Sequence, residues 1–446
     1  MRLQSFLYVL AAVLSGAFAA SIGARKHNPD LALPLYSSGR WIYNSKGETV
    51  TYVGGNWPGA ADAMIPEGLQ YQSVSYIAGK FAEVGMNSVR LTYAIELVDQ
   101  IYENGGKDVP IKTALVEALG TENGTKVYHE ILEHNPSFHK DITRLEVYDA
   151  IAEELYKRGI YLHLDNHVSK GMWCCGTDGN GWFNDTYFDV HNWLRGWQYM
   201  ASHGKKWKAL SSVGLRNELR SPASGYAYPV NFEVWTEYMT KAAEVVHKAN
   251  SDVLIFFSGL NYDTTLHEIV YGNPLSDSSN ATFDIRDYDF LHKAVFELHS
   301  YSSPTECESF WSSLYSDGFA CLNESDTDVV NRLPVVLTEW GHSEEDISDA
   351  YESVYSTCLH RKAAEYKFGW MLWTVLGDYY IRSGTQDVED TWAILAKNET
   401  VFRGVMSTEA VESMIADTLA SDVDEGVYAS QKEIKSWASY KVKGGA

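Results

Sequence analysis

Basic residues are scarce in this sequence of 446 residues. Lys and Arg number 36 against 59 Asp and Glu, so the formal net charge is -23 at pH 7. A strongly negative chain repels polyanions, which argues against a nucleic acid as partner. The same charge balance favours a neutral molecule as substrate.

Long apolar runs are also missing, apart from one at the start of the chain. Met1 and Arg2 precede an apolar stretch over residues 6–14, and Ala17-Phe18-Ala19 offers small residues for cleavage. This pattern is typical of a secretory signal peptide, and we expect residues 1–19 to be removed. The run is too short for a transmembrane helix and no second span follows, so we expect a secreted, extracellular protein that does not contact a membrane.

The chain has no long linker rich in Ser, Thr and Pro, no internal repeat, and no glycine-rich phosphate loop after its first strand. The missing linker predicts one catalytic domain over residues 20–406, followed by a polar tail over residues 407–446. Residues 408–419 have the pattern of a closing helix, and we expect the rest of the tail to be mobile. Without the glycine motif, nucleotide binding has no support.

Cysteine is rare, with five residues that all follow the signal. In an oxidising compartment we expect Cys307 to pair with Cys321, and Cys174 or Cys175 to pair with Cys358, which leaves one thiol over. A zinc site at Cys174-Cys175 is the alternative, but neighbours in sequence cannot easily both ligate a tetrahedral metal.

Five Asn-x-Ser/Thr sequons accompany the signal, each in polar, loop-like sequence. Because such sites lie at the surface of secreted proteins, we expect glycosylation. The asparagines are Asn123, Asn184, Asn280, Asn323 and Asn398.

Eight short apolar runs alternate with helical sequence through most of the chain, and the runs lack strict alternation of apolar and polar residues. Strands buried on both faces have this pattern. An α/β fold, the eight-stranded (β/α)8 TIM barrel with loop insertions, is the simplest arrangement, and a doubly wound open sheet is the rival. Residues 95–144 form an insertion after the second run, and we expect them to build part of a cleft wall. The runs cover residues 49–55, 88–92, 160–165, 212–216, 253–257, 294–298, 335–338 and 370–374.

A glutamate lies at the end of two of these runs. Glu218 follows the fourth run and Glu339 follows the seventh. In a barrel the carboxyl ends of the strands meet over one opening, so these residues become neighbours. Two facing carboxyl groups are what acid/base cleavage of a glycosidic bond requires. Either glutamate alone is more often a paired structural charge, and their joint position favours catalysis.

Further polar and aromatic residues lie at strand ends in the order seen in a known family. With them the chain resembles glycoside hydrolase family 5, the cellulase A family of clan A barrels. Stretches 164–167, 173–175, 181–183 and 215–220 are similar to the cellulase-like branch found in plants and fungi. The resemblance covers residues 41–404. The matching residues are Arg90, His167, Asn217, Glu218, His299, Tyr301, Glu339 and Trp373.

The resemblance implies a role for each matching residue. Glu218 would be the general acid/base and Glu339 the nucleophile of a retaining mechanism, with Arg90 beside the nucleophile. Asn217 would contact the sugar 2-hydroxyl, and Tyr301 would bond the nucleophile. His167 and His299 would line the two sides of the cleavage point. Flat apolar faces for sugar rings are expected from Trp373, Trp57, Trp173, Trp182 and Trp340.

The expected substrate is a β-linked glucan, cleaved as by an endo-β-1,4-glucanase. The family also contains mannanases and exo-glycosidases, and the insertion together with residues 173–185 could close one end of the cleft, so endo and exo action both stay open. A non-catalytic carbohydrate-binding barrel and a metal-dependent hydrolase are alternatives from other classes. Arg90 could be a buried structural ion-pair member, and Asp165-x-His167 could suggest a metal pair. We expect a monomer with no metal and no cofactor.

Overall fold

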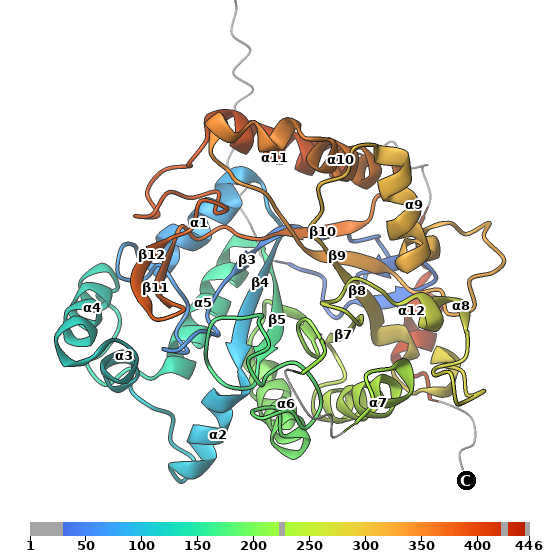
Figure 1. Cartoon of the computed structure of the whole chain (residues 1–446). Helices are drawn as coiled ribbons and strands as arrows, with labels where there is room; N and C mark the ends of the chain where they lie inside the picture. The colour runs from blue at the N-terminus through green and yellow to red at the C-terminus, as the bar shows by residue number, and fades with distance from the viewer. Residues whose placement is uncertain (1–29, 223–227, 421–426, 442–446) are drawn as a thin grey trace, which may run out of the picture.

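Eight parallel strands close a barrel at the centre of the molecule (Figure 1). The computed structural model describes residues 30–222, 228–420 and 427–441. Each strand pairs with the next along the chain, and the last pairs with the first. The barrel strands are β3 (Val53–Trp57), β4 (Ser88–Ala94), β5 (Tyr161–Val168), β6 (Leu210–Gly214), β7 (Leu254–Ser258), β8 (Ala294–Ser300), β9 (Val335–Trp340) and β10 (Gly369–Leu372).

The closed barrel confirms the predicted (β/α)8 fold, and the open sheet is excluded. Each of the eight predicted runs overlaps its own barrel strand. The run over residues 49–55 begins before β3, and the run over residues 212–216 ends beyond β6. Apolar residues mark a buried strand but not the residue at which backbone pairing stops.

Helices connect the strands and cover the outside of the barrel (Figure 1). Ser73 caps the start of α1 through its side chain, and Gly85 ends that helix with a positive φ of 94°. Thr143 and Glu146 form a capping box at the start of α5. None of the described helices combines the length and the apolar character needed to cross a membrane. The covering helices are α1 (Val74–Val84), α5 (Arg144–Arg158), α6 (Val190–His203), α7 (Phe232–Ala249), α8 (His267–Tyr271), α9 (Cys307–Asp317), α10 (Val354–Tyr366) and α11 (Val405–Leu419).

Two insertions meet on one side of the barrel (Figure 1). One follows β4 and is helical, as the sequence predicts, and the other is an antiparallel hairpin after β10 that no sequence pattern predicts. The Gln386 side-chain amide joins them by donating to the Leu119 carbonyl at 3.0 Å. The insertions contain α2 (Ile95–Glu103), α3 (Ile111–Leu119), α4 (Thr121–His134), β11 (Asp378–Arg382) and β12 (Thr385–Glu389). Short 3-10 helices complete the connections: η1 (Gly204–Lys206), η2 (Ile285–Asp287), η3 (Leu291–Lys293), η4 (Phe319–Leu322), η5 (Asp346–Ser348) and η6 (Ala350–Glu352).

The amino-terminal end of the barrel is closed by a hairpin of β1 (Tyr36–Ser38) and β2 (Trp41–Tyr43). Leu35 and Ile42 of this hairpin region pack into an apolar cluster with Phe256 and other residues inside the barrel. Because all members of this cluster except Tyr52 have apolar side chains, burial of apolar area stabilises this end.

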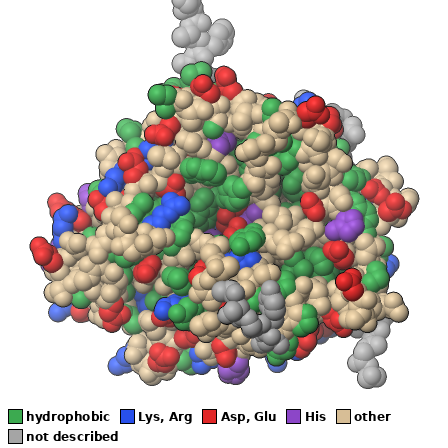
Figure 2. Space-filling model, in the orientation of Figure 1, with side chains coloured by type: hydrophobic (Ala, Val, Ile, Leu, Met, Phe, Trp, Pro, Cys, Tyr) green, Lys and Arg blue, Asp and Glu red, His purple; other side chains and the backbone are tan. Residues whose placement is uncertain are grey.

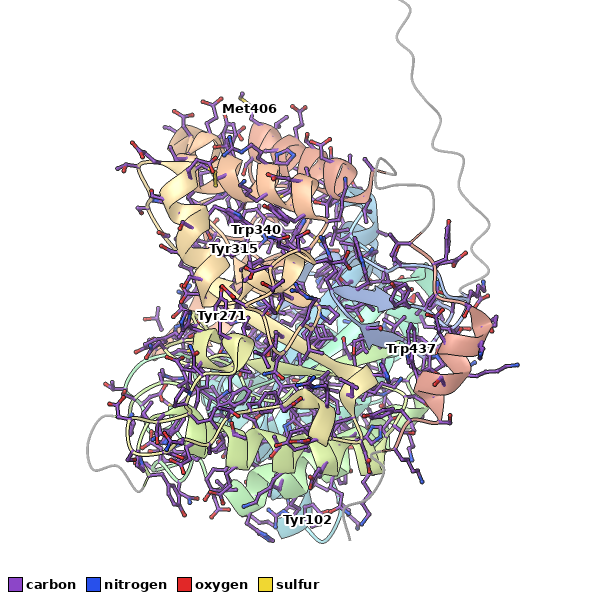
Figure 3. The ribbon with its side chains drawn as sticks, turned by 90° about the vertical axis from the view of Figure 1, so that its right-hand side faces the viewer. Tyr102, Tyr271, Tyr315, Trp340, Met406 and Trp437 are labelled. Atoms are coloured by element: carbon purple, nitrogen blue, oxygen red, sulfur yellow. A yellow bond between two sulfur atoms is a disulfide. The ribbon has the colours of Figure 1, made fainter. Side chains whose placement is uncertain are left out.

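The helix α12 (Gln431–Ala438) packs against the same hairpin. Its Trp437 lies against Tyr36 and Tyr43, with ring centroids 6.3 and 5.4 Å apart (Figure 3). The expectation of a mobile tail beyond residues 408–419 is therefore wrong for α12, because its aromatic face has a partner in the hairpin. The predicted signal over residues 1–19 lies outside the described residues.

One disulfide joins two neighbouring helices on the outside of the barrel. Cys307 at the start of α9 is bonded to Cys358 of α10, with 5.3 Å between their Cα atoms. Cys321 is a buried free thiol in η4. The predicted pairing of Cys307 with Cys321 is wrong, because the packing of α9 beside α10 brings a more distant cysteine to Cys307.

Candidate active site

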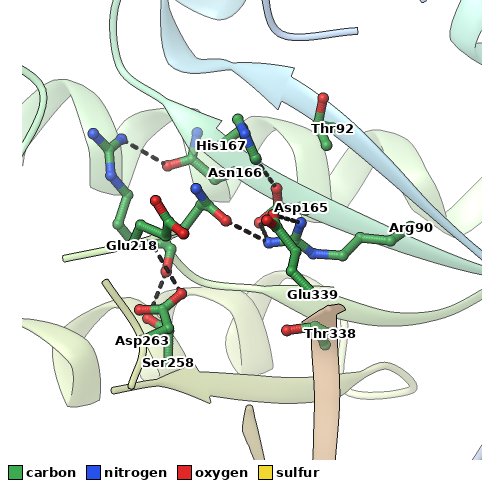
Figure 4. A network of polar contacts seen from close by, with 12 residues as sticks. Arg90, Thr92, Asp165, Asn166, His167, Glu218, Ser258, Asp263, Thr338 and Glu339 are labelled. Atoms are coloured by element: carbon green, nitrogen blue, oxygen red, sulfur yellow. Dashed lines mark hydrogen bonds and ion pairs between the residues drawn. The ribbon is translucent and has the colours of Figure 1, made fainter. Parts of the chain in front are cut away.

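The carboxyl ends of the barrel strands bring the predicted polar residues into one network (Figure 4). Neighbouring strands place Asn56 beside Arg90, and His299 beside Glu339. On the face shown in Figure 2, hydrophobic side chains surround a central hollow in which acidic and histidine side chains are visible. The barrel thus gathers residues that are hundreds of positions apart in sequence.

Glu218 and Glu339 face each other across this end of the barrel. One carboxylate oxygen of each and one imidazole nitrogen of His299 all lie within 4.8 Å of one another. His299 Nδ1 lies 3.2 Å from a Glu218 oxygen and 3.7 Å from a Glu339 oxygen. Burial lowers the pKa of His299 to about 4, so its ring is neutral near pH 7.

Glu339 is held by two donors. Arg90 Nη1 donates to one carboxylate oxygen at 2.6 Å, and the Tyr301 hydroxyl donates to the other at 3.0 Å. Burial alone would lower the pKa of Arg90, but the charges of Asp165 and Glu339 raise it above its ordinary value. A permanent positive charge therefore faces the Glu339 carboxylate.

Glu218 has different surroundings. Its side chain is 12% exposed, and burial raises its pKa above the ordinary value although His167, Arg220 and Arg90 act in the opposite direction. A carboxyl group with a raised pKa keeps its proton at a higher pH and can act as an acid. Glu218 is thus suited to carry a proton, and Glu339 lies opposite it as a carboxylate beside the Arg90 cation.

Asp263 supports Glu218, and the sequence gives no motif for it. Its carboxylate accepts the Glu218 backbone N–H at 2.8 Å, and its carbonyl accepts the His299 N–H at 2.8 Å. Asn261, Tyr262 and Asp263 have φ values of 52°, 64° and 57°, three consecutive left-handed residues without a glycine. Such strain costs about 1 kcal/mol or more per residue and clusters at functional sites. The only sequence signal is its place in the loop after the fifth strand.

A layer of buried ionisable groups lies under the glutamate pair. Burial raises the pKa of Glu297 to about 8, and burial lowers the pKa of His163 to about 3. Burial followed by the charges of Glu297 and Glu218 raises the pKa of Asp263 well above its ordinary value. Arg90 forms an ion pair with Asp165 at 3.1 Å, and both side chains are fully buried.

Asn217 connects Arg90 to a second disulfide. Its Oδ1 accepts from Arg90 Nη2 at 2.7 Å, and its Nδ2 lies 3.5 Å from both sulfurs of Cys174 and Cys175, which are bonded to each other. The predicted bond from one of these cysteines to Cys358 is therefore wrong, because Cys358 lies beside Cys307.

Aromatic rings gather around His167 at the carboxyl end of β5. Trp373 stacks on His167 with centroids 5.3 Å apart and an interplanar angle of 8°. Trp173 meets Trp373 edge to face at 6.4 Å, and Tyr379 of the unpredicted hairpin at 4.8 Å. His167 Nδ1 is 2.8 Å from the Asp165 carboxylate. Trp373 and Trp173 thus lie together next to His167.

Three tryptophans predicted to face sugar rings lie in the core instead: Trp57, Trp182 and Trp340 are each at most 1% exposed. Asn56 points into the barrel, so the next residue along the strand points outward, and Trp57 stacks on Phe81 of α1. Figure 3 shows Trp340 in the interior. For Trp57 and Trp340 the predictions are wrong because a shift of one residue along a strand changes the face to which a side chain points. Trp182 lies in the loop after β5, where it is buried against Phe183.

Two groups of residues in the described part of the chain have metal-binding side chains close together. One group is Glu218, His299 and Glu339. Its two carboxylates already have partners, because both lie close to His299 and Glu339 also accepts from Arg90 and Tyr301. The other is His167 with Cys174 and Cys175, whose sulfurs are bonded to each other and so offer no thiolate.

Comparisons with known proteins fit this geometry. A family model described as Cellulase (glycosyl hydrolase family 5) matches residues 44–378. A glycosyl hydrolase 5 family protein of Chamaecyparis obtusa is 32% identical over 375 residues, which cover 81% of this chain and 62% of that relative. The chain thus spans about 62% of the length of the curated relative.

Solved structures share the fold at low identity. A cellotetraose complex of an endocellulase from Pyrococcus horikoshii has a TM-score of 0.63 at 16% identity, over 86% of this chain and 99% of that one. The catalytic domain of the major endoglucanase from Xanthomonas campestris has a TM-score of 0.57 at 15% identity, with coverage of 86% and 99%. At this identity the likeness concerns the fold alone.

Proposed function

Because the chain belongs to glycosyl hydrolase family 5, we propose that it hydrolyses a β-linked glucan by double displacement, with Glu218 as acid/base and Glu339 as nucleophile. The observation that carries the proposal is the short separation of the two carboxylates, within 4.8 Å. Retaining glycosidases have carboxyl groups about 5–5.5 Å apart, whereas inverting enzymes need about 6.5–9.5 Å to admit a water molecule.

In the first step Glu218 gives its proton to the glycosidic oxygen while the Glu339 carboxylate attacks the anomeric carbon. The bond to the leaving sugar breaks, and a covalent glycosyl-enzyme forms. The raised pKa of Glu218 supports its role as the proton donor. Arg90 and Tyr301 fix the two Glu339 oxygens, which aims the nucleophile before the substrate arrives.

In the second step Glu218 acts as a base. It takes a proton from a water molecule, the water oxygen attacks the anomeric carbon, and Glu339 leaves as a carboxylate. Asn217 is held by Arg90 beside this centre, where it can contact the sugar 2-hydroxyl in the transition state. Neutral His299 lies between the carboxylates and adds no charge to the pair.

A β-1,4-linked glucan is the substrate we propose. Solved neighbours of the same fold are described as endocellulases, and the stacked Trp373 and His167 offer a flat face to a pyranose ring. Mannanase and exo-β-glycosidase activities are the alternatives within the family. A non-catalytic carbohydrate-binding barrel is the alternative of another class, and the paired glutamates with their donors speak against it.

We also propose that the protein is secreted, glycosylated and monomeric. Secretion is supported by the signal pattern of residues 1–19, and glycosylation by the exposure of four sequon asparagines with a partly exposed fifth, Asn323. Asn123 lies in the first turn of α4 instead of in a loop, and its side chain is exposed.

The test is release of sugars by the wild-type protein from a panel of β-linked glucans, mannans and aryl glycosides. Glu339→Gln keeps the shape of the side chain but removes the nucleophile, so we expect activity to fall by about a thousandfold or more in a protein that still folds. Chromatography of the products names the substrate. A variant that keeps more than a few percent of activity would show that Glu339 is not the nucleophile.

A further inference from the structure

A depression lies beside Tyr301, along the loops that follow β8 and β9. It has a volume of about 650 Å³ and is lined by Tyr301, the residue whose hydroxyl donates to Glu339. A molecule that occupies it therefore lies next to the bond that is cleaved. We propose that this depression binds a further neutral sugar ring of the glycan, with Trp392 as its platform. The proposal rests on the proposed function and extends it.

Trp392 is exposed, whereas the other tryptophans are buried or partly buried. Trp392 is 39% exposed, which makes it the most exposed of the 14 tryptophans, all of which lie within the described residues. Its ring centroid lies 5.8 Å from that of Tyr301, at an interplanar angle of 50°. An exposed indole leaves apolar area in water, and the apolar face of a sugar ring can cover it.

The platform is fixed before a ligand binds. The Trp392 backbone N–H donates to Asp390 at 2.9 Å, and its carbonyl accepts from the Thr374 N–H at 3.3 Å. Arg382 holds the same aspartate at 3.0 Å. A β-carbon added at Gly341 would lie 3.5 Å from the indole, so the ring rests close to the backbone there. Little conformational entropy is lost when a ligand stacks on a ring that is already held.

The lining chemistry selects the ligand class. None of the described residues that line the depression is Lys, Arg, Asp or Glu, although the chain carries a net charge of -23. The polar groups are hydroxyls, including those of Ser302, Ser303 and Ser343, and the imidazole of His342. Hydroxyl groups suit a neutral, hydroxyl-rich ring. A uronate or a phosphorylated sugar would bring a negative charge without a cationic partner.

The test measures binding separately from turnover. The Glu339→Gln protein, with and without Trp392→Ala, is titrated by calorimetry with cello- and manno-oligosaccharides of two to six units. We expect the Trp392→Ala change to weaken binding of the longer chains roughly three- to tenfold, the value of one aromatic contact, and to leave the shortest bound chain unchanged. Trp392→Phe keeps a flat ring and should recover most of the affinity.

A matched control removes another exposed aromatic side chain far from the site. Tyr102→Ala on α2, labelled in Figure 3, should leave binding of every chain length unchanged. The proposal is overturned by an equal loss at all lengths, by no loss at any length, by no binding of any oligosaccharide, or by equally tight binding of an oligouronide. Hydrolysis by the wild type reports on the proposed function alone, so either proposal can fail without the other.

Discussion

At the carboxyl end of the barrel, Arg90 lies buried between Asp165 at 3.1 Å and Glu339 at 2.6 Å. At the amino end, Leu35 and Ile42 pack in a cluster of aliphatic and aromatic side chains that contains no acidic or basic residue. Burying charges costs free energy that their pairing only partly returns, whereas burying apolar area is favourable throughout. The amino end thus stabilises the fold, and the carboxyl end carries the groups that chemistry needs.

Removing the central cation should give the largest change. Arg90→Met leaves Asp165 and Glu339 buried without the cation that they share, so we expect a loss of about 3–5 kcal/mol in the free energy of unfolding and no measurable activity. Although burial raises the pKa of Asp165, Arg90 and His167 hold it below the ordinary value. A depressed carboxyl pKa contributes stability above the ordinary pKa, and this stability is lost as the pH falls.

Urea unfolding of Arg90→Met at pH 4 and pH 7 checks this prediction. The loss should be larger at pH 7, because the buried Asp165 carboxyl group, once Arg90 no longer opposes the effect of burial, takes up a proton more readily at pH 4 than at pH 7. Leu35→Ala at the amino end is the matched control, with a loss of about 2–4 kcal/mol that does not change between the two pH values. A loss in Arg90→Met that is equal at both pH values would contradict the electrostatic account of the carboxyl end.

Glu297→Gln tests whether the carboxyl end also sets the pH dependence of stability. Burial raises the Glu297 pKa to about 8, so its contribution is complete below the unfolded pKa and is lost as the pH rises towards 8. Each pKa unit corresponds to about 1.4 kcal/mol, so the wild type should lose a few kcal/mol between pH 5 and pH 8. We expect a flatter curve for the variant in urea titrations. An unchanged slope would rule out Glu297 as its source.

Two variants of Asp263 distinguish its hydrogen bond to the Glu218 backbone from the effect of its charge. Asp263→Ala removes the acceptor of the Glu218 N–H, so we expect kcat to fall about 10- to 100-fold with little change in KM. Asp263→Asn keeps an oxygen at that place and should retain most of the activity. The two variants are compared on the best substrate of the panel over a range of pH. Equal losses in both would assign the effect to the charge instead of the hydrogen bond.

We expect the smallest change from Trp437→Ala, which tests whether the amino end of the barrel affects stability without affecting activity. The ring packs on Tyr36 and Tyr43 at the amino end, so we expect a loss of about 1–2 kcal/mol with unchanged kcat and KM. Thermal unfolding and steady-state kinetics on the same preparation check it. A fall in kcat would show that the two ends of the barrel are coupled.

The same contrast explains which features the sequence predicts. Apolar runs mark the eight barrel strands, and polar residues at their ends, such as Arg90 and Glu339, come together because a closed barrel leaves them no other place. Local patterns hold no information on long-range packing. The bond between Cys307 and Cys358 could not be predicted for this reason, because it depends on the packing of two neighbouring helices.

The sequence pattern also does not predict the direction in which an individual side chain points. Trp57 points to the helix layer because it follows the inward-facing Asn56, while the unpredicted Trp392 is exposed beside the site. Asp263 reaches Glu218 through three left-handed residues. Asn261 and Asp263 are types that adopt this conformation more often than others, but Tyr262 is not, so the residue types do not predict the whole turn.

The anomeric configuration of the first product tests the central claim most directly. Proton NMR spectra recorded during the first minutes of hydrolysis of the best β-linked substrate distinguish the two anomers before mutarotation. Two carboxylates within 4.8 Å and a covalent intermediate predict that the β-anomer appears first. Initial release of the α-anomer would contradict the double displacement by Glu218 and Glu339.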